Sequence, residues 1–200
     1  MTDTGNSESK RLLIAQELDE QLRAELARAS AVLYDSGAHV RWVPESNLHL
    51  SLFFIGDTPV EHIEDLKDAL DTEATQTKPF EFTVSSVGFF GRRNSPRVVW
   101  ADVEAVPEMM ELQERLSSRL EQLGFKSERR KYKPHITLGR VKSSQNRKEL
   151  LKALDEFKAL TFGTVYNESC VLMESVLGPS GAKYSIAHRS KFQRIESPTD

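Results

Sequence analysis

The sequence predicts an α+β protein in which most strands pair in an antiparallel manner. Four segments repeat apolar residues every three to four positions, which is the period of an amphipathic helix. Short segments rich in aliphatic, β-branched and aromatic residues lie between them, and several are joined by turn residues. One short pattern also occurs twice, at a separation near half the chain, which suggests two related lobes.

The first half of the chain alternates strands with helices. The expected elements are, in chain order, a strand at 11–15, a helix at 17–34, strands at 39–43 and 48–55, a helix at 60–70, and paired strands at 80–84 and 98–103. Gly37 closes the first helix. Gly56 and Asp57 predict a turn, and Pro59 precedes the second helix.

The second half of the chain repeats this alternation. We expect a helix at 106–123 that ends at Gly124, a strand at 135–141, a helix at 150–157 and a closing hairpin of strands 171–176 and 183–188. The elements fill one domain of ordinary size, at residues 10–193. The polar segments 1–9 and 194–200 are expected to be disordered tails.

Composition and charge exclude several classes of protein. The 27 basic and 30 acidic residues give a net charge of −3, so any affinity for nucleic acid has to come from the placement of charge. The single Cys170 excludes an internal disulfide and a thiolate metal cluster within the chain. No apolar run reaches the roughly 18 residues of a membrane span, and no signal peptide is visible. We therefore expect a cytoplasmic protein without a membrane partner.

The repeated pattern is histidine, aliphatic residue, hydroxyl residue, leucine. It occurs at His49–Leu52 and at His135–Leu138, 86 positions apart (135 − 49). Because side chains alternate across a strand, each histidine shares one face with its hydroxyl residue, Ser51 or Thr137. Two lobes would then bring two imidazoles and two hydroxyls together.

That set of groups suits phosphoester cleavage without a metal. One imidazole can remove a proton from water, the other can protonate the leaving oxygen, and the hydroxyls can bind phosphoryl oxygens. A single histidine of this kind is more often a structural residue, but two matched copies favour a site. A zinc site is the competing interpretation, and neither copy has the spacing of a zinc-binding motif.

At these motifs the chain resembles the bacterial and archaeal RNA 2′,3′-cyclic phosphodiesterases, or 2′-5′ RNA ligases, of the two-histidine phosphoesterase superfamily. The resemblance covers about residues 10 to 193. It rests on residues 11–15, 41–43, 47–52, 96–101 and 133–140, and on Glu174, Ser175, Gly178, Pro179 and Tyr184.

The resemblance implies a two-lobed fold with two antiparallel sheets facing a central cleft, helices outside and no cofactor or metal. It implies that His49 donates a proton to the leaving ribose O3′ and that His135 accepts one from water, giving a 2′-phosphate. Ser51, Thr137 and Arg140 would hold the phosphate. Where the family usually has threonine, this chain has Ser51. Serine keeps the hydroxyl, but its χ1 rotamer is less restricted because it lacks the β-branch.

RNA or oligonucleotide ends, tRNA fragments among them, are the expected partners of a monomer. Two basic segments agree with this, and they contain Arg92, Arg93, Arg97, Lys126, Arg129, Arg130, Lys131, Lys133, Arg140 and Lys142. Phe90, Tyr132 and Tyr184 are candidates for base stacking, although aromatic residues in strands are more often core. Two alternatives stay open: a phosphodiesterase for another cyclic phosphate or a 2′-5′ linkage, and a non-catalytic module that binds RNA ends.

Overall fold

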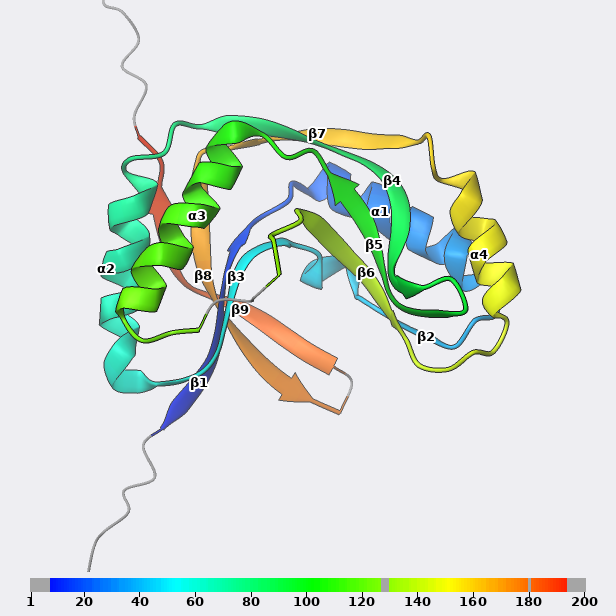
Figure 1. Cartoon of the computed structure of the whole chain (residues 1–200), viewed down its shortest axis with the longest axis horizontal. Coiled ribbons are helices and arrows are strands. Elements are labelled where there is room, and N and C mark those ends of the chain that lie inside the picture. Colours follow the sequence, from blue (N-terminus) through cyan, green and yellow to red (C-terminus); the bar gives the residue numbers. More distant parts are fainter. Residues whose placement is uncertain (1–7, 127–129, 180, 194–200) are drawn as a thin grey trace, which may run out of the picture.

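The computed structural model describes residues 8–126, 130–179 and 181–193, which form nine strands, four α-helices and two short 3₁₀ helices (Figure 1). The elements are, in chain order, β1 (Ser9–Gln16), α1 (Glu20–Tyr34), β2 (Val40–Trp42), η1 (Glu45–Asn47), β3 (Leu50–Pro59), η2 (Val60–His62), α2 (Ile63–Ala74), β4 (Phe80–Arg92), β5 (Ser95–Val103), α3 (Pro107–Gln122), β6 (His135–Val141), α4 (Arg147–Glu156), β7 (Thr161–Asn167), β8 (Ser169–Gly178) and β9 (Gly181–Lys191).

The predicted helices all form, and three details of the prediction need correction. Helix α1 begins at Glu20, later than expected, because the Asp19 side chain caps it by accepting a hydrogen bond from the Leu22 amide at 2.7 Å. The predicted turn at Gly56 and Asp57 is wrong, because both residues pair with β1 inside the longer strand β3. Strand β7 has no counterpart among the predicted elements.

The strands pair antiparallel throughout, in the order β7-β4-β5-β6-β3-β1-β8-β9, and β2 pairs with the Gly139–Val141 end of β6. In the described parts of the chain, β3 and β6 are joined by one ladder pair, Leu50 with Ile136. The two expected sheets are therefore two halves of one curled sheet, which meet at this pair (Figure 1). The α+β fold class is confirmed.

The helices divide between the two halves. Helices α2 and α3 pack on each other, α2 also contacts β8 and β9, and α3 contacts β3. Helices α1 and α4 pack on each other, with α1 against β7 and α4 against β4. Figure 1 shows the two helix pairs at opposite ends of the molecule.

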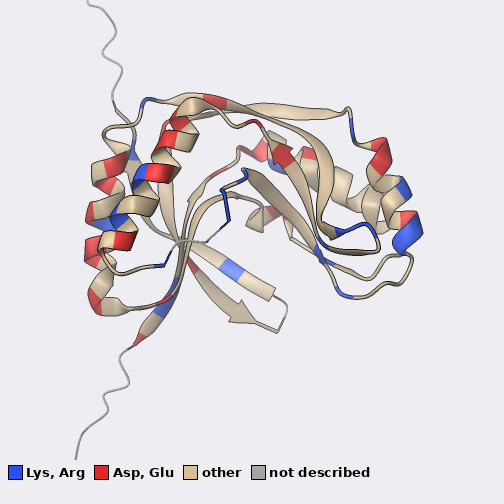
Figure 2. Cartoon of the chain, viewed as in Figure 1, with Lys and Arg blue, Asp and Glu red and all other residues tan. Residues whose placement is uncertain are grey.

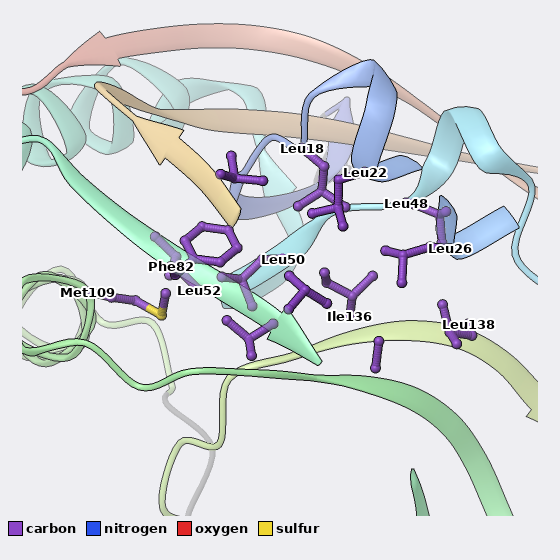
Figure 3. Packing of buried hydrophobic residues seen from close by; sticks show 14 of the residues in the cluster. Leu18, Leu22, Leu26, Leu48, Leu50, Leu52, Phe82, Met109, Ile136 and Leu138 are labelled. Atoms are coloured by element: carbon purple, nitrogen blue, oxygen red, sulfur yellow. The ribbon is translucent and has the colours of Figure 1, made fainter. Parts of the chain in front are cut away.

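The main core lies on the side of the sheet that carries the aliphatic residues of both histidine motifs. Leu50, Leu52, Ile136 and Leu138 are all at most 2% exposed and belong to the same buried cluster as Phe82 (Figure 3). A second, small cluster of Leu13, Ala15, Val171 and Met173 lies apart from it, and Tyr184 packs on it. The first cluster holds the sheet and helices together, since burial of apolar side chains is the dominant stabilising term.

The ends of the described chain are tied into the fold. Ser9 already lies in β1, the carbonyl of Glu8 accepts a hydrogen bond from Val60, and the amide of Gln193 donates to the carbonyl of Thr77. Residues 1–7 and 194–200 of the expected tails lie outside the described residues, as does Arg129 of the basic segment. In the described part of the chain, none of the helices has the length and apolar character that crossing a bilayer requires.

Candidate active site

Both histidine motifs contain a β-bulge at the same position. In the β1–β3 ladder, Ala15 pairs with Ser51 and Ile14 with Phe53, so Leu52 is skipped. In the β5–β6 ladder, Trp100 pairs with Thr137 and Val99 with Gly139, so Leu138 is skipped. Two consecutive residues of each strand therefore face the core, and the alternation is reset by one residue.

The bulges decide which face the fifth residue after each histidine occupies. Strict alternation would place Arg140 on the core side, opposite to His135. The bulge at Leu138 returns Arg140 to the side of His135, where it pairs with Val98 and is exposed. Phe54 is returned to the side of His49 in the same way, and it pairs with Leu13 of the small cluster. We call this side of the sheet the histidine face; it carries His49, Ser51, Phe54, His135, Thr137 and Arg140.

His49 is half-buried and is held on both sides of its ring. Its Nδ1 lies 2.8 Å from the carbonyl oxygen of Asn47, and its Nε2 lies 3.1 Å from Ser51 Oγ. The ring of Tyr184 packs edge-on against the imidazole, with 4.9 Å between centroids. Burial lowers the pKa of His49 below its usual 6.5, and the hydrogen bond to Asn47 acts in the opposite direction.

His135 is held by the same kind of backbone hydrogen bond. Its Nδ1 lies 2.7 Å from the carbonyl oxygen of Lys133, two residues before it, as Asn47 is before His49. The ring of Phe90 packs edge-on against it at 4.8 Å between centroids, and Trp100 follows at 6.4 Å. The Lys133 ammonium lies over the Trp100 ring at 4.0 Å and pairs with Asp102 at 3.4 Å.

These hydrogen bonds fix the protonation pattern of both imidazoles. A backbone carbonyl can only accept, so Nδ1 carries a proton in each ring. In the neutral state, Nε2 then carries a free electron pair, and in the charged state it carries the second proton. Each histidine therefore presents one nitrogen that can take or give a proton.

The hydroxyl residues lie at the crossing of the two strands. Leu50 and Ile136 form the pair that joins β3 to β6, and His49, Ser51, His135 and Thr137 flank this pair on the other face. An antiparallel crossing sets His49 next to Thr137, and Ser51 next to His135. The structure thus brings together both predicted histidines and both predicted hydroxyls.

The three candidates for base stacking lie in different surroundings. Phe90 and Tyr184 each contact one of the histidine rings. Tyr132 instead packs against the main core, and its hydroxyl donates a hydrogen bond to the carbonyl of Ser51 at 2.9 Å. Burial raises the pKa of the Tyr132 hydroxyl well above its usual value. Tyr132 therefore acts as a brace between β3 and the segment that leads into β6.

Sequence reasoning missed several residues that shape the site. Asn47 orients His49 and donates a side-chain hydrogen bond to the carbonyl of Ala182 in the β8–β9 hairpin, at 2.6 Å. Trp100 faces Thr137 across the ladder, and Gly88 leaves room for its indole. A pocket beside His49 includes Asn47, Met173 and Tyr184 in its lining. In the described ranges, no three His, Cys, Asp or Glu side chains are grouped as metal ligands.

Comparison with known proteins identifies the family. The sequence profile of the 2′-5′ RNA ligase superfamily matches residues 16–166, more than half of the chain. The chain belongs to the 2′-5′ RNA ligase superfamily. The RNA 2′,3′-cyclic phosphodiesterase of Thermotoga maritima is 32% identical over 183 residues, which cover 92% of this chain and 96% of that protein. The enzyme of the same name from Methanothermobacter thermautotrophicus is 32% identical over 175 residues, or 88% and 95% of the two chains.

Solved structures give the same result for the fold. TT0787 of Thermus thermophilus superposes with a TM-score of 0.79 at 28% identity, over 92% of this chain and 98% of that one. Escherichia coli LigT in its apo form gives a TM-score of 0.76 at 23% identity, over 94% and 100%. The resemblance predicted from the two motifs is therefore confirmed, both as a superfamily of enzymes and as a fold.

Proposed function

We propose that this member of the 2′-5′ RNA ligase superfamily hydrolyses RNA ends that carry a 2′,3′-cyclic phosphate, giving a 2′-phosphomonoester and a free 3′-hydroxyl. The observation that carries the proposal is the matched pair of Nδ1 hydrogen bonds, which leaves Nε2 of each histidine as the atom that can exchange a proton; in the free protein, Nε2 of His49 lies 3.1 Å from Ser51 Oγ. The names of the two 32% identical relatives support the choice of substrate.

In the proposed reaction, the oxygen of a water molecule bonds to phosphorus as the bond from phosphorus to O3′ breaks. His135 Nε2 takes the proton of the water, and His49 Nε2 gives its proton to the leaving O3′. Ser51, Thr137 and Arg140 stabilise the charge on the phosphoryl oxygens, as hydroxyl and guanidinium donors do in other phosphoryl-transfer sites. A 5′-hydroxyl of RNA in place of water would give a 2′-5′ linkage by the same steps, which would be ligation without ATP.

The two proposed roles require different protonation states of the two imidazoles. His135 as base has to be neutral, and His49 as acid has to be protonated, although burial lowers its pKa. An anionic phosphate beside Nε2 favours the charged form of an imidazole. We therefore propose that the substrate itself brings His49 into its donor state, so that the acid forms where the leaving oxygen is bound.

The decisive experiment uses a short oligoribonucleotide with a 2′,3′-cyclic phosphate, in the presence of EDTA. We expect the wild-type protein to release a 2′-phosphate, identified by phosphorus NMR. His49→Ala and His135→Ala should each lose about 10²–10⁴-fold in turnover. His39→Ala is the matched control, because the His39 side chain is exposed and its Nδ1 lies 3.3 Å from the hydroxyl of Ser143.

Other outcomes would replace the proposal. Turnover that EDTA abolishes and a divalent ion restores would overturn the two-histidine mechanism. If the protein turns over a 2′-5′ oligoadenylate or ADP-ribose cyclic phosphate but not the oligoribonucleotide, its substrate is another cyclic phosphate or a 2′-5′ linkage. Tight binding of the RNA end without turnover would make the chain a binding module.

A further inference from the structure

Two arginines are direct neighbours on the histidine face. Arg41 of β2 and Arg140 of β6 are opposite partners in their antiparallel ladder. The residues on either side of Arg41, Val40 and Trp42, pack against the main core, so Arg41 points to the other face. Both arginines are exposed. Arg41 thus lies one strand farther than Arg140 from the position predicted for the cyclic phosphate.

Like charges directly opposite in a ladder destabilise it unless something compensates their repulsion. Two other basic residues around this end of the sheet have carboxylate partners, Lys133 with Asp102 and Arg93 with Asp155. Within the described residues, no Asp or Glu oxygen lies within ion-pairing distance of Arg41 or Arg140. The two guanidinium groups are thus available to anions that the chain does not supply.

The position of Arg41 relative to the other half of the sheet narrows the choice of anion. Its guanidinium lies at the tip of the β8–β9 hairpin, where a Cβ placed on Gly181 would be 3.0 Å from Nη2. Arg41 therefore extends from the β6 half toward the β9 half. An anion here would lie beyond the phosphate bound by Arg140, on a path along the histidine face.

We propose that Arg41 binds the phosphodiester that joins the terminal nucleotide to the rest of the RNA. This inference rests on the proposed function and adds a substrate preference to it: cyclic ends on chains of two or more nucleotides are preferred over free cyclic mononucleotides. Arginine suits this task because its planar fork offers several donors to one phosphate and keeps its charge at every physiological pH.

The test compares three substrates that share one cyclic end. They are 2′,3′-cyclic AMP, the dinucleotide ApA with a 2′,3′-cyclic phosphate, and the same dinucleotide with an uncharged methylphosphonate linkage. We expect kcat/KM of the wild-type protein to be about ten-fold higher for the charged dinucleotide than for the methylphosphonate. Arg41→Ala should remove most of this ratio. Lys152→Ala on α4, which changes the net charge equally at an exposed site, should keep it.

A ratio near one in the wild-type protein, or a ratio that Arg41→Ala leaves intact, would overturn the role of Arg41 while the proposed function stands. If the wild-type protein turns over none of the three substrates, the proposed function fails instead. Binding then tests Arg41, by calorimetry with ApA 2′-phosphate and its methylphosphonate analogue. Equal affinities for the two, or an equal loss of both in Arg41→Ala, would overturn the inference.

Discussion

The hydroxyl of Tyr132 donates a hydrogen bond to the backbone carbonyl of Ser51, at 2.9 Å. Tyr132 lies three residues before His135, and Ser51 lies two residues after His49, so this bond connects the two histidine strands. The strands share one ladder pair, Leu50 with Ile136, among the residues described. Because burial raises the pKa of the Tyr132 hydroxyl well above its usual value, the hydroxyl stays protonated and remains a donor at neutral pH.

We predict that Tyr132→Phe lowers kcat about five-fold and changes KM little, because it removes one neutral hydrogen bond that positions the strands. The free energy of unfolding should fall by about 1 kcal/mol. Steady-state kinetics and chemical denaturation measure the two effects. Tyr34→Phe at an exposed ring is the control. An unchanged kcat in a destabilised Tyr132→Phe would show that the brace stabilises the fold without positioning the histidines.

The second prediction concerns the pKa of His49, which burial lowers in the free protein. At pH 7 the neutral form of the free imidazole is therefore favoured more strongly than in an ordinary histidine. A bound phosphate should raise this pKa, because an adjacent anion favours the imidazolium ion. Proton NMR titration of His49, with and without adenosine 2′-phosphate, measures the change. A pKa that stays the same or falls on binding would argue against His49 as the proton donor.

Arg140 provides the third prediction. Arg140→Lys keeps the charge and loses the planar fork, so we expect kcat/KM for a cyclic phosphate to fall by about ten-fold. Arg28→Lys, on the exposed side of α1, should have no effect and controls for the exchange itself. Wild-type kinetics in Arg140→Lys would show that the guanidinium does not bind the phosphate with two donors.

The fourth prediction concerns Gly88, which faces Trp100 across the β4–β5 ladder. A Cβ at this position would lie 2.7 Å from Cζ2 of the buried indole, so Gly88→Ala has to displace the ring. We expect a loss of about 1–3 kcal/mol in unfolding free energy. A lower kcat should accompany it, since Trp100 and Phe90 pack beside His135.

Trp100→Phe tests the cause of that loss, because the smaller ring frees the space that the added methyl group needs. The double variant Gly88→Ala, Trp100→Phe should lose less unfolding free energy than the two single variants lose together, as expected for residues in contact. Additive losses would mean that the alanine acts elsewhere.

Much of the site could be predicted from the sequence, because strand alternation is a local property. Alternation alone correctly placed His49 with Ser51 and His135 with Thr137 on one face. Arg140 is different. Alternation places it on the core side, and only the resemblance of the chain to a known family predicted that Arg140 holds the phosphate. The bulge that turns it depends on pairing between strands far apart in the chain, which no local pattern records.

The parts of the fold that sequence missed have similar causes. Strand β7 contains Gly163 and several exposed side chains, so its apolar pattern is weak, and it forms by pairing with β4. Gly56 and Asp57 are residue types typical of turns, but they lie in a strand because they pair with β1. The basic segment before β6 could be predicted from the sequence, and Figure 2 also shows acidic residues on helices such as α2 and α3.

The two matched bulges also give the two histidine motifs different neighbours on the histidine face. The fifth residue after each histidine faces the site, and it is Arg140 after one and Phe54 after the other, with the Arg11 guanidinium 5.0 Å from the Phe54 ring. His49 and Ser51 repeat as His135 and Thr137, and the residue at this position is one of the differences between the two copies. A cyclic phosphate has two ester oxygens of which one must leave, and in the proposed reaction this difference between the two motifs would help to set which one does.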